Sequence, residues 1–157
     1  MLGWSMVGAV ALLLALPAYA QGTSADMNMQ ILRDKVKADK KALVAANMQL
    51  TDAEAKAFWP IYDQYQHDLG AINDRLAKAI VSYADAYNAG PLSDATAKKL
   101  LDESIAIDES EVKLRREYAA KLTAAIHAAK AARYLQIESK IRAAIRYELA
   151  SKIPLVQ

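Results

Sequence analysis

The feature that most constrains the fold is the scarcity of residues that interrupt a helix. After Ala20 the sequence contains only three Gly and three Pro in 137 residues. Most other positions hold Ala, Leu, Lys, Glu, Gln or Arg, which are good helix formers, and 33 residues of the full chain are Ala. Clusters of β-branched residues and the dipeptides that close β-hairpins are missing. The sequence therefore predicts an all-α protein.

Two capping motifs and one turn divide the chain into helices. Thr51 precedes Glu54 by three residues, the spacing of a capping box, in which each side chain accepts a hydrogen bond from the other residue's backbone N–H. Ser93 begins a looser copy of the motif, and the segment 88–91 between the two copies is a strong turn signal. We expect about four helices, over 28–48, 52–88, 93–126 and 128–152. The two central ones should form an elongated antiparallel hairpin, flanked by the shorter helices.

Apolar residues in the second expected helix recur with the 3.5-residue period of a packing seam. The seam contains Phe58, Tyr62, Tyr65, Leu69, Ile72 and Leu76, and Pro60 inside it should kink the helix. The third helix has a poorer stripe, which Asp108 and Arg115 interrupt; its apolar members are Leu101, Ile105, Val112, Leu122 and Ile126. Such a core is thin, so we expect a homodimer to bury the remaining apolar face.

Residues 1–20 have the organisation of a secretory signal peptide. An apolar run over 7–16 is followed by a proline and by an Ala-Tyr-Ala cleavage motif that ends at Ala20. The run is about half as long as a membrane-spanning helix, which makes a permanent transmembrane anchor the weaker alternative. We expect cleavage after Ala20, a periplasmic location and a single all-helical domain over 21–157.

The residues that most enzyme classes need are missing or isolated. The chain has no Cys, which excludes disulfides, thiolate nucleophiles and zinc–thiolate sites, and it lacks a phosphate-binding loop. Neither His67 nor His127 follows a Glu by three residues, so a di-iron centre of the carboxylate-bundle type is excluded. Asp63 and His67 lie one helical turn apart, and a metal site that adds His127 is the alternative to two surface histidines. We expect no enzyme activity, no cofactor and no metal site.

Charge is distributed unevenly along the chain, although the net charge is only +2. Residues 113–157 contain ten Lys or Arg and three acids, whereas residues 91–112 contain two bases and six acids. A basic helical surface can bind nucleic acid, but the export signal argues against that partner. Unfolded or envelope proteins, or peripheral contact with a membrane, suit an exported protein better. A merely soluble basic face is the plain alternative.

The residues that we expect to contact such a partner are basic side chains of the last two helices and aromatic side chains of the second helix. The basic ones are Arg115, Arg116, Lys121, Arg133, Arg142 and Arg146. The aromatic ones are Trp59, Tyr62 and Tyr65, for which burial in the core is the alternative. The apolar tail over 153–157 either folds back on the helices or offers a wedge to a partner.

Several of these segments resemble the Spy/CpxP superfamily of small periplasmic helical proteins. The segment 50–54 (LTDAE) is similar to the LTxxQ motif of that superfamily, with Glu in place of Gln, and 92–96 (LSDAT) is a looser copy. The block 58–62 (FWPIY) and the ending 147–155 (YELASKIPL) look like an uncharacterised subgroup placed near the superfamily. The resemblance covers about residues 44–156.

What the resemblance implies is ATP-independent chaperoning or envelope-stress sensing by a cradle-shaped helical dimer, whose basic concave face holds unfolded clients. We therefore expect a chaperone-like periplasmic protein that holds unfolded or partner polypeptides on a basic and apolar helical surface. Some relatives bind metals through His-rich or acidic positions, from which this sequence departs. A metal-responsive sensor and a structural adaptor for an envelope partner are the alternatives.

Overall fold

A computed structural model of the protein describes residues 37–156. The expected signal peptide over 1–20 and the beginning of the expected first helix lie outside the described residues. The chain divides into two compact units, Met1–Leu43 and Val44–Gln157. The single domain expected for the mature chain stays a prediction, and the description that follows concerns the second unit, which contains the long helices.

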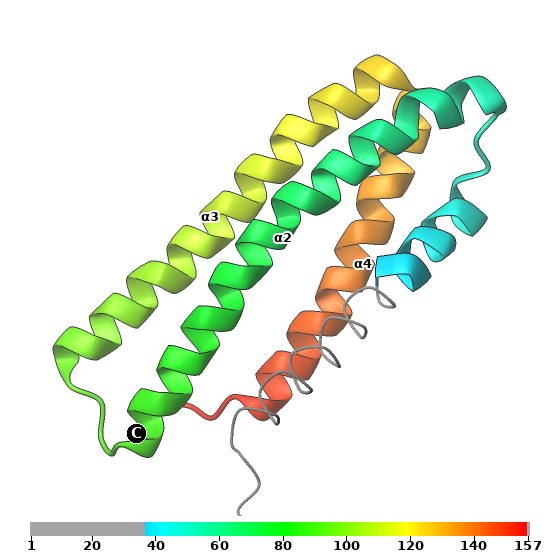
Figure 1. Ribbon diagram of the computed structural model, residues 1–157. Coiled ribbons are helices and arrows are strands. Elements are labelled where there is room, and N and C mark those ends of the chain that lie inside the picture. The colour runs from blue at the N-terminus through cyan, green and yellow to red at the C-terminus, as the bar shows by residue number, and fades with distance from the viewer. Residues whose placement is uncertain (1–36, 157) are drawn as a thin grey trace, which may run out of the picture. The chain divides into compact units, whose positions relative to one another are not determined.

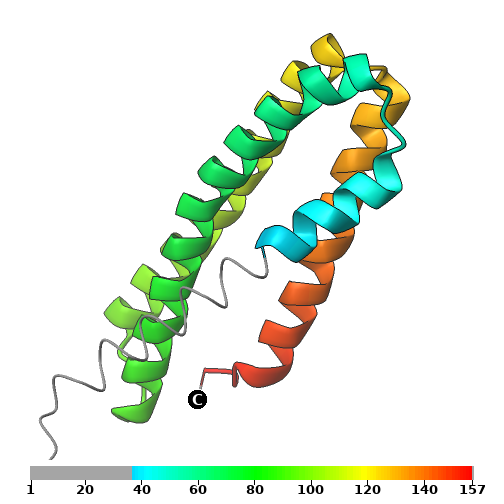
Figure 2. The ribbon, with the colours of Figure 1, turned by 45° about the vertical axis from the view of Figure 1, so that its right-hand side comes forward.

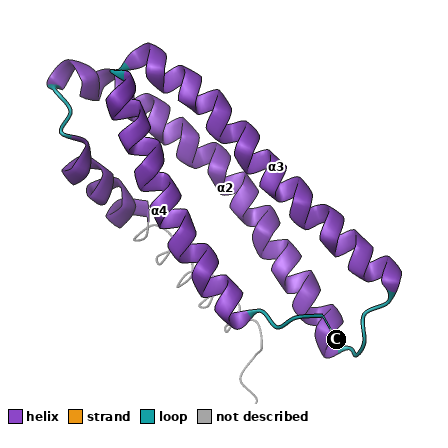
Figure 3. Ribbon diagram, turned by 180° about the vertical axis from the view of Figure 1, so that it is seen from behind, coloured by secondary structure: helices purple, strands orange, loops and turns teal. Residues whose placement is uncertain are grey.

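Helices make up almost all of the described chain, and no strand occurs between residues 37 and 156 (Figures 1 and 3). A helix over 37–48 is followed by α2 (Asp52–Asn88), α3 (Asp94–Ala125) and α4 (Ala128–Lys152). The all-α prediction is confirmed, and the helix ends agree with the expected ones to within one residue wherever the structure describes them. None of these helices combines the length and the apolar character needed to cross a bilayer.

The helix ends follow the local sequence signals. The Thr51 hydroxyl accepts a hydrogen bond from the Glu54 backbone N–H at 3.3 Å, and the Glu54 carboxylate accepts one from the Thr51 N–H at 2.9 Å. The expected capping box is thus complete. Ser93 begins α3 by accepting from the Thr96 N–H at 3.2 Å. In the turn between α2 and α3, Gly90 has a φ of 126°, which a side chain would strain.

Helices α2 and α3 run antiparallel along each other, and α4 returns beside them at an incline (Figures 1 and 2). The 37 residues of α2 span about 55 Å, so the hairpin is elongated, as expected. Helix α2 continues through Pro60. Further along the hairpin, the Arg75 guanidinium donates to the Glu103 carboxylate at 3.1 and 3.2 Å and to the Ser110 hydroxyl at 3.1 Å, which fixes α2 against α3.

The core lies where the three helices meet, and its largest buried side chains are aromatic. The Tyr134 ring of α4 lies edge-on to Phe58 and Tyr65 of α2, with centroid distances of 5.1 and 5.9 Å. Tyr65 makes the same kind of contact with Tyr118 of α3 at 5.2 Å. Each such pair adds about 0.5–1.5 kcal/mol beyond the burial of its area. The seam predicted for the second helix therefore packs as core.

The prediction that the apolar stripe of the third helix packs in the core is wrong for three of its residues. Leu101, Ile105 and Val112 are 59%, 49% and 54% exposed. The buried face of α3 consists of Ile107, Glu111, Leu114, Tyr118 and Leu122. Because this face is rotated around the helix axis from the expected stripe, three large apolar side chains remain on the outside of α3.

Candidate functional site

The three aromatic residues expected at a partner-binding surface lie at different depths. Tyr62 and Tyr65 are only 3% and 2% exposed, and burial raises the pKa of each phenol to about 12 because the phenolate loses its hydration. Both residues belong to the core, which corrects their assignment to the surface. Trp59 is partly buried and packs edge-on against Phe58 and Tyr62, with ring centroids 5.0 and 5.3 Å apart.

Two of the expected partner-binding arginines form ion pairs with acidic residues of α3. Arg142 donates to both carboxylate oxygens of Glu111, and Arg146 donates to Asp108 and, at 3.0 Å, to Glu111. The side chains of Glu111 and Arg142 are 8% and 20% exposed. Hydrogen bonding to Asp108 raises the pKa of Arg146 above its usual value. We call these four residues the α3–α4 ion cluster; its formal charges cancel.

Other polar side chains tie α2 to the remaining two helices. The Gln66 amide donates to the Tyr134 hydroxyl at 3.1 Å and to the buried Glu138 carboxylate at 2.8 Å. The Tyr118 hydroxyl donates to Asp68 at 2.5 Å, which lowers the pKa of that carboxyl. Every buried polar side-chain atom in the described part of the chain has a hydrogen-bond partner. These hydrogen bonds therefore connect α2 to α3 and α4.

The remaining four basic residues of the expected surface are exposed. Arg115, Arg116 and Lys121 lie on α3, whereas Arg133 lies on α4. The Lys121 ammonium is 4.3 Å from the centroid of the Tyr118 ring, a distance typical of a cation–π contact. Arg115 and Arg116 are thus exposed on α3, whereas Arg142 and Arg146 are paired with the carboxylates of the α3–α4 ion cluster.

The outer side of α3 combines exposed apolar side chains with both basic and acidic ones. Leu101, Ile105 and Val112 are separated by four and seven residues, which places them on one side of the helix. A shallow depression along this side is lined by Ile105, Asp108, Glu109, Val112, Lys113 and Arg116. We define the α3 outer face as Leu101, Ile105, Val112, Lys113 and Arg116.

Sequence reasoning missed the apolar half of this face. It assigned Leu101, Ile105 and Val112 to packing, because their spacing is helical. The signal that could have separated them is the presence of Asp108 and Arg115 within the same stripe, since charged residues are rarely buried without a partner.

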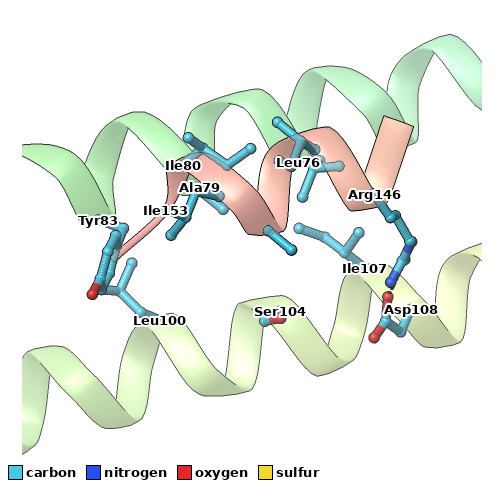
Figure 4. A pocket seen from close by; sticks show the side chains of 12 residues that line it. Leu76, Ala79, Ile80, Tyr83, Leu100, Ser104, Ile107, Asp108, Arg146 and Ile153 are labelled. Atoms are coloured by element: carbon cyan, nitrogen blue, oxygen red, sulfur yellow. Dashed lines mark hydrogen bonds and ion pairs between the residues drawn. The ribbon is translucent and has the colours of Figure 1, made fainter. Parts of the chain in front are cut away.

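A groove of about 470 Å³ lies between the second half of α2, the first half of α3 and the last turns of α4 (Figure 4). Its aliphatic lining consists of Leu76, Ala79, Ile80, Leu100, Ile107, Leu149, Ala150 and Ile153. Figure 4 shows Tyr83 at one end of the groove and the Arg146–Asp108 pair at the other, with Ser104 on the α3 side. The groove is therefore apolar along its length and charged at one end.

The alternative metal site receives no support from the described part of the chain. Asp63, His67 and His127 are each exposed. Among residues 37–156 no three His, Asp or Glu side chains are grouped in a way that could hold a metal ion.

Comparisons with known proteins returned no relatives. No family model, no curated protein and no solved structure matches the chain. The resemblance to the Spy/CpxP superfamily therefore stays a prediction.

Proposed function

We propose that the protein is an exported, ATP-independent, chaperone-like protein that holds unfolded or partner polypeptides on the α3 outer face. The observation that supports the proposal is the placement of three large exposed apolar side chains beside Lys113 and Arg116 on one side of a helix. Apolar contact is non-directional and suits clients without a common sequence. Positive charge increases the rate of encounter with acidic segments.

The proposal relies on fewer basic residues than the sequence suggested. Arg142 and Arg146 neutralise Glu111 and Asp108, so an acidic client segment would have to compete with these two carboxylates for them. Lys113 and Arg116 of the α3 outer face, together with the exposed Arg115 beside them in the sequence, take the main electrostatic role. The contributions of Arg133 and Lys121 stay predictions, as do the periplasmic location and the homodimer.

Aggregation of a denatured client tests the proposal directly. The protein is produced with its own N-terminus and purified from the periplasm, where mass spectrometry determines whether cleavage follows Ala20. We expect a near-stoichiometric amount to suppress light scattering when the client is diluted from denaturant, without nucleotide, and high salt to weaken the effect because it screens the charges. No suppression at several-fold excess would contradict the proposal.

Variants of the α3 outer face show where the client binds. We expect Leu101→Gln, Ile105→Gln and Val112→Gln together to abolish suppression while the circular dichroism spectrum is kept, because all three side chains are exposed. The matched control replaces three exposed apolar residues of α2 and α4 with Gln: Val81, Ile145 and Tyr147. Equal loss in both variants would refute the assignment to α3.

Two further measurements separate the rival explanations. Arg115→Glu with Arg116→Glu should reduce suppression most strongly at low salt, since these charges act on encounter. Sedimentation equilibrium of every variant distinguishes loss of a homodimer from loss of client contact. Capture of one stoichiometric envelope partner, without suppression of aggregation, would favour the structural adaptor instead.

A further inference from the structure

We propose that the groove between α2, α3 and α4 binds a single-chain zwitterionic amphiphile of the monoacyl phospholipid type. The acyl chain lies along the aliphatic lining, and the head lies at the end formed by Arg146 and Asp108. The groove shares Asp108 with the depression along the α3 outer face but contains none of the five residues that define that face, and the proposal does not depend on the chaperone-like function.

The size and lining of the groove favour an apolar occupant. A volume of about 470 Å³ lies within the range of roughly 300–1,000 Å³ that is common for small-molecule sites. Side chains from three helices form the walls, and most of them are aliphatic. Water in such a groove finds few hydrogen-bond partners, so an apolar ligand that displaces it gains free energy.

The walls favour an acyl chain over an extended peptide. They are the sides of helices, whose backbone groups are already paired within each helix. The hydroxyl of Tyr83 donates to the Pro154 carbonyl at 2.7 Å, which leaves the Ser104 hydroxyl as a side-chain partner along the lining. An extended peptide would bring two backbone polar groups per residue without partners, whereas an acyl chain brings none.

The charged end favours a head that bears both signs. The side chains of Arg146 and Asp108 are 45% and 55% exposed, and the α3–α4 ion cluster is neutral as a whole. A purely anionic head would meet Asp108, and a purely cationic head would meet Arg146. Within the cluster Arg146 donates through one terminal nitrogen and Asp108 accepts through one oxygen. A zwitterion can therefore place its phosphate against Arg146 and its ammonium group against Asp108 while their ion pair is kept, so both charges are matched.

The length of the groove also predicts the length of the acyl chain that it binds. The stretch of α3 from Leu100 to Asp108, both of which line the groove, measures about 12 Å, which an extended chain of about ten carbons would span. Affinity should therefore rise with chain length up to about ten carbons and then level off, because further methylenes pass the Tyr83 end into solvent.

Isothermal titration calorimetry with three ligands that share a twelve-carbon chain tests the proposal, below the concentration at which each forms micelles. The ligands are dodecylphosphocholine, dodecanoate and dodecyltrimethylammonium. We expect one molecule of dodecylphosphocholine to bind per chain, at least about fivefold more tightly than either of the others. No binding heat at a tenfold excess, or equal affinity for all three, would overturn the proposal.

Groove variants test the location. Ala150 lines the groove at an exposed position of α4, so Ala150→Trp should fill the groove without disturbing the core and weaken dodecylphosphocholine binding by at least about tenfold. The matched control is Ala143→Trp, two turns earlier on α4 and outside the lining, which should bind as the wild type does. Undiminished binding by Ala150→Trp would overturn the proposal.

Variants of the charged end test the head. Arg146→Gln with Asp108→Asn removes both charges together and should make the three affinities equal to within about twofold; a retained preference for the zwitterion would overturn the proposal. Suppression of client aggregation by Ala150→Trp should equal that of the wild type, so failure of the groove and failure of the α3 outer face are distinguishable. Binding of an apolar helical peptide in the groove, in place of the amphiphile, would also overturn it.

Discussion

The Glu54 carboxylate binds two residues, Thr51 and Lys130, of which the sequence predicts the first. It closes the capping box on the Thr51 N–H, as the spacing predicts. The same carboxylate accepts from the Lys130 ammonium at 2.5 Å, and Lys130 also donates to the Gln49 carbonyl at 2.9 Å. Lys130 belongs to the first turn of α4, so a local cap also holds α4 to the beginning of α2.

These contacts make stability depend on pH. The hydrogen bond from Lys130, followed by that from the Thr51 backbone, lowers the pKa of Glu54 from 4.5 to about 2. Because the pKa is lower in the folded state, the ionised carboxylate stabilises the fold at any pH above the pKa of the unfolded chain. This contribution is lost as the pH falls toward 2. We expect Glu54→Gln to lower the urea midpoint at neutral pH, with a gap from the wild type that closes between about pH 4.5 and 2.

The measurement is urea unfolding of both proteins, followed by circular dichroism across that pH interval. Glu148→Gln is the control, because the Lys152 ammonium is 3.8 Å from this carboxylate in an exposed pair within one helix, and such pairs contribute little. A gap for Glu54→Gln that persists unchanged at the acidic end would contradict the assignment.

Two glycines in and after α2 should respond in opposite directions to the same substitution. Gly70 lies in the middle of α2, and a Cβ placed on it meets no atom within 4 Å. Gly70→Ala should therefore raise the free energy of unfolding by about 0.5–1 kcal/mol, because alanine loses less backbone freedom on folding. Gly90→Ala should lower it by about 1–3 kcal/mol, because its φ of 126° strains a side chain. Thermal unfolding measures both; a shift of the same sign would contradict this reading of the turn.

At the scale of the whole molecule, Tyr134 connects the three helices. The Tyr134 ring contacts Phe58 and Tyr65 of α2, and the Tyr134 hydroxyl accepts a hydrogen bond from Gln66. Tyr65 in turn contacts Tyr118 of α3. Tyr134→Ala should lower the free energy of unfolding by about 3–5 kcal/mol.

Tyr134→Phe is the matched variant, because it keeps the ring and loses only the hydroxyl. It should lower the free energy of unfolding by about 1–2 kcal/mol. Equilibrium unfolding in denaturant compares the two variants, and a single transition is expected because the ring cluster joins α2, α3 and α4. A cost for Tyr134→Phe equal to that of Tyr134→Ala would show that the hydroxyl, not the ring packing, holds α4 in place.

The sequence by itself determined the helices and their ends, because these depend on contacts between residues a few positions apart. The capping box at Thr51, the Ser93 cap and the turn at Gly90 each act within about one helical turn, so their residue spacing is sufficient to place them. The sequence also predicts the buried face of α2, because one strongly periodic stripe of apolar residues leaves a single choice of face.

Only the tertiary structure decided which side of α3 is buried and which arginines remain available. α3 has two candidate stripes, and the choice between them depends on where α2 and α4 lie, because Tyr118 packs on Tyr65 of α2 and Glu111 pairs with Arg142 of α4. Arg142 pairs with Glu111, 31 residues away, and this pairing both buries Glu111 and removes Arg142 from the expected partner-binding surface. The groove likewise exists only between three helices. Such contacts join residues far apart in sequence, and their free energy depends on helix packing, which no local pattern of residues specifies.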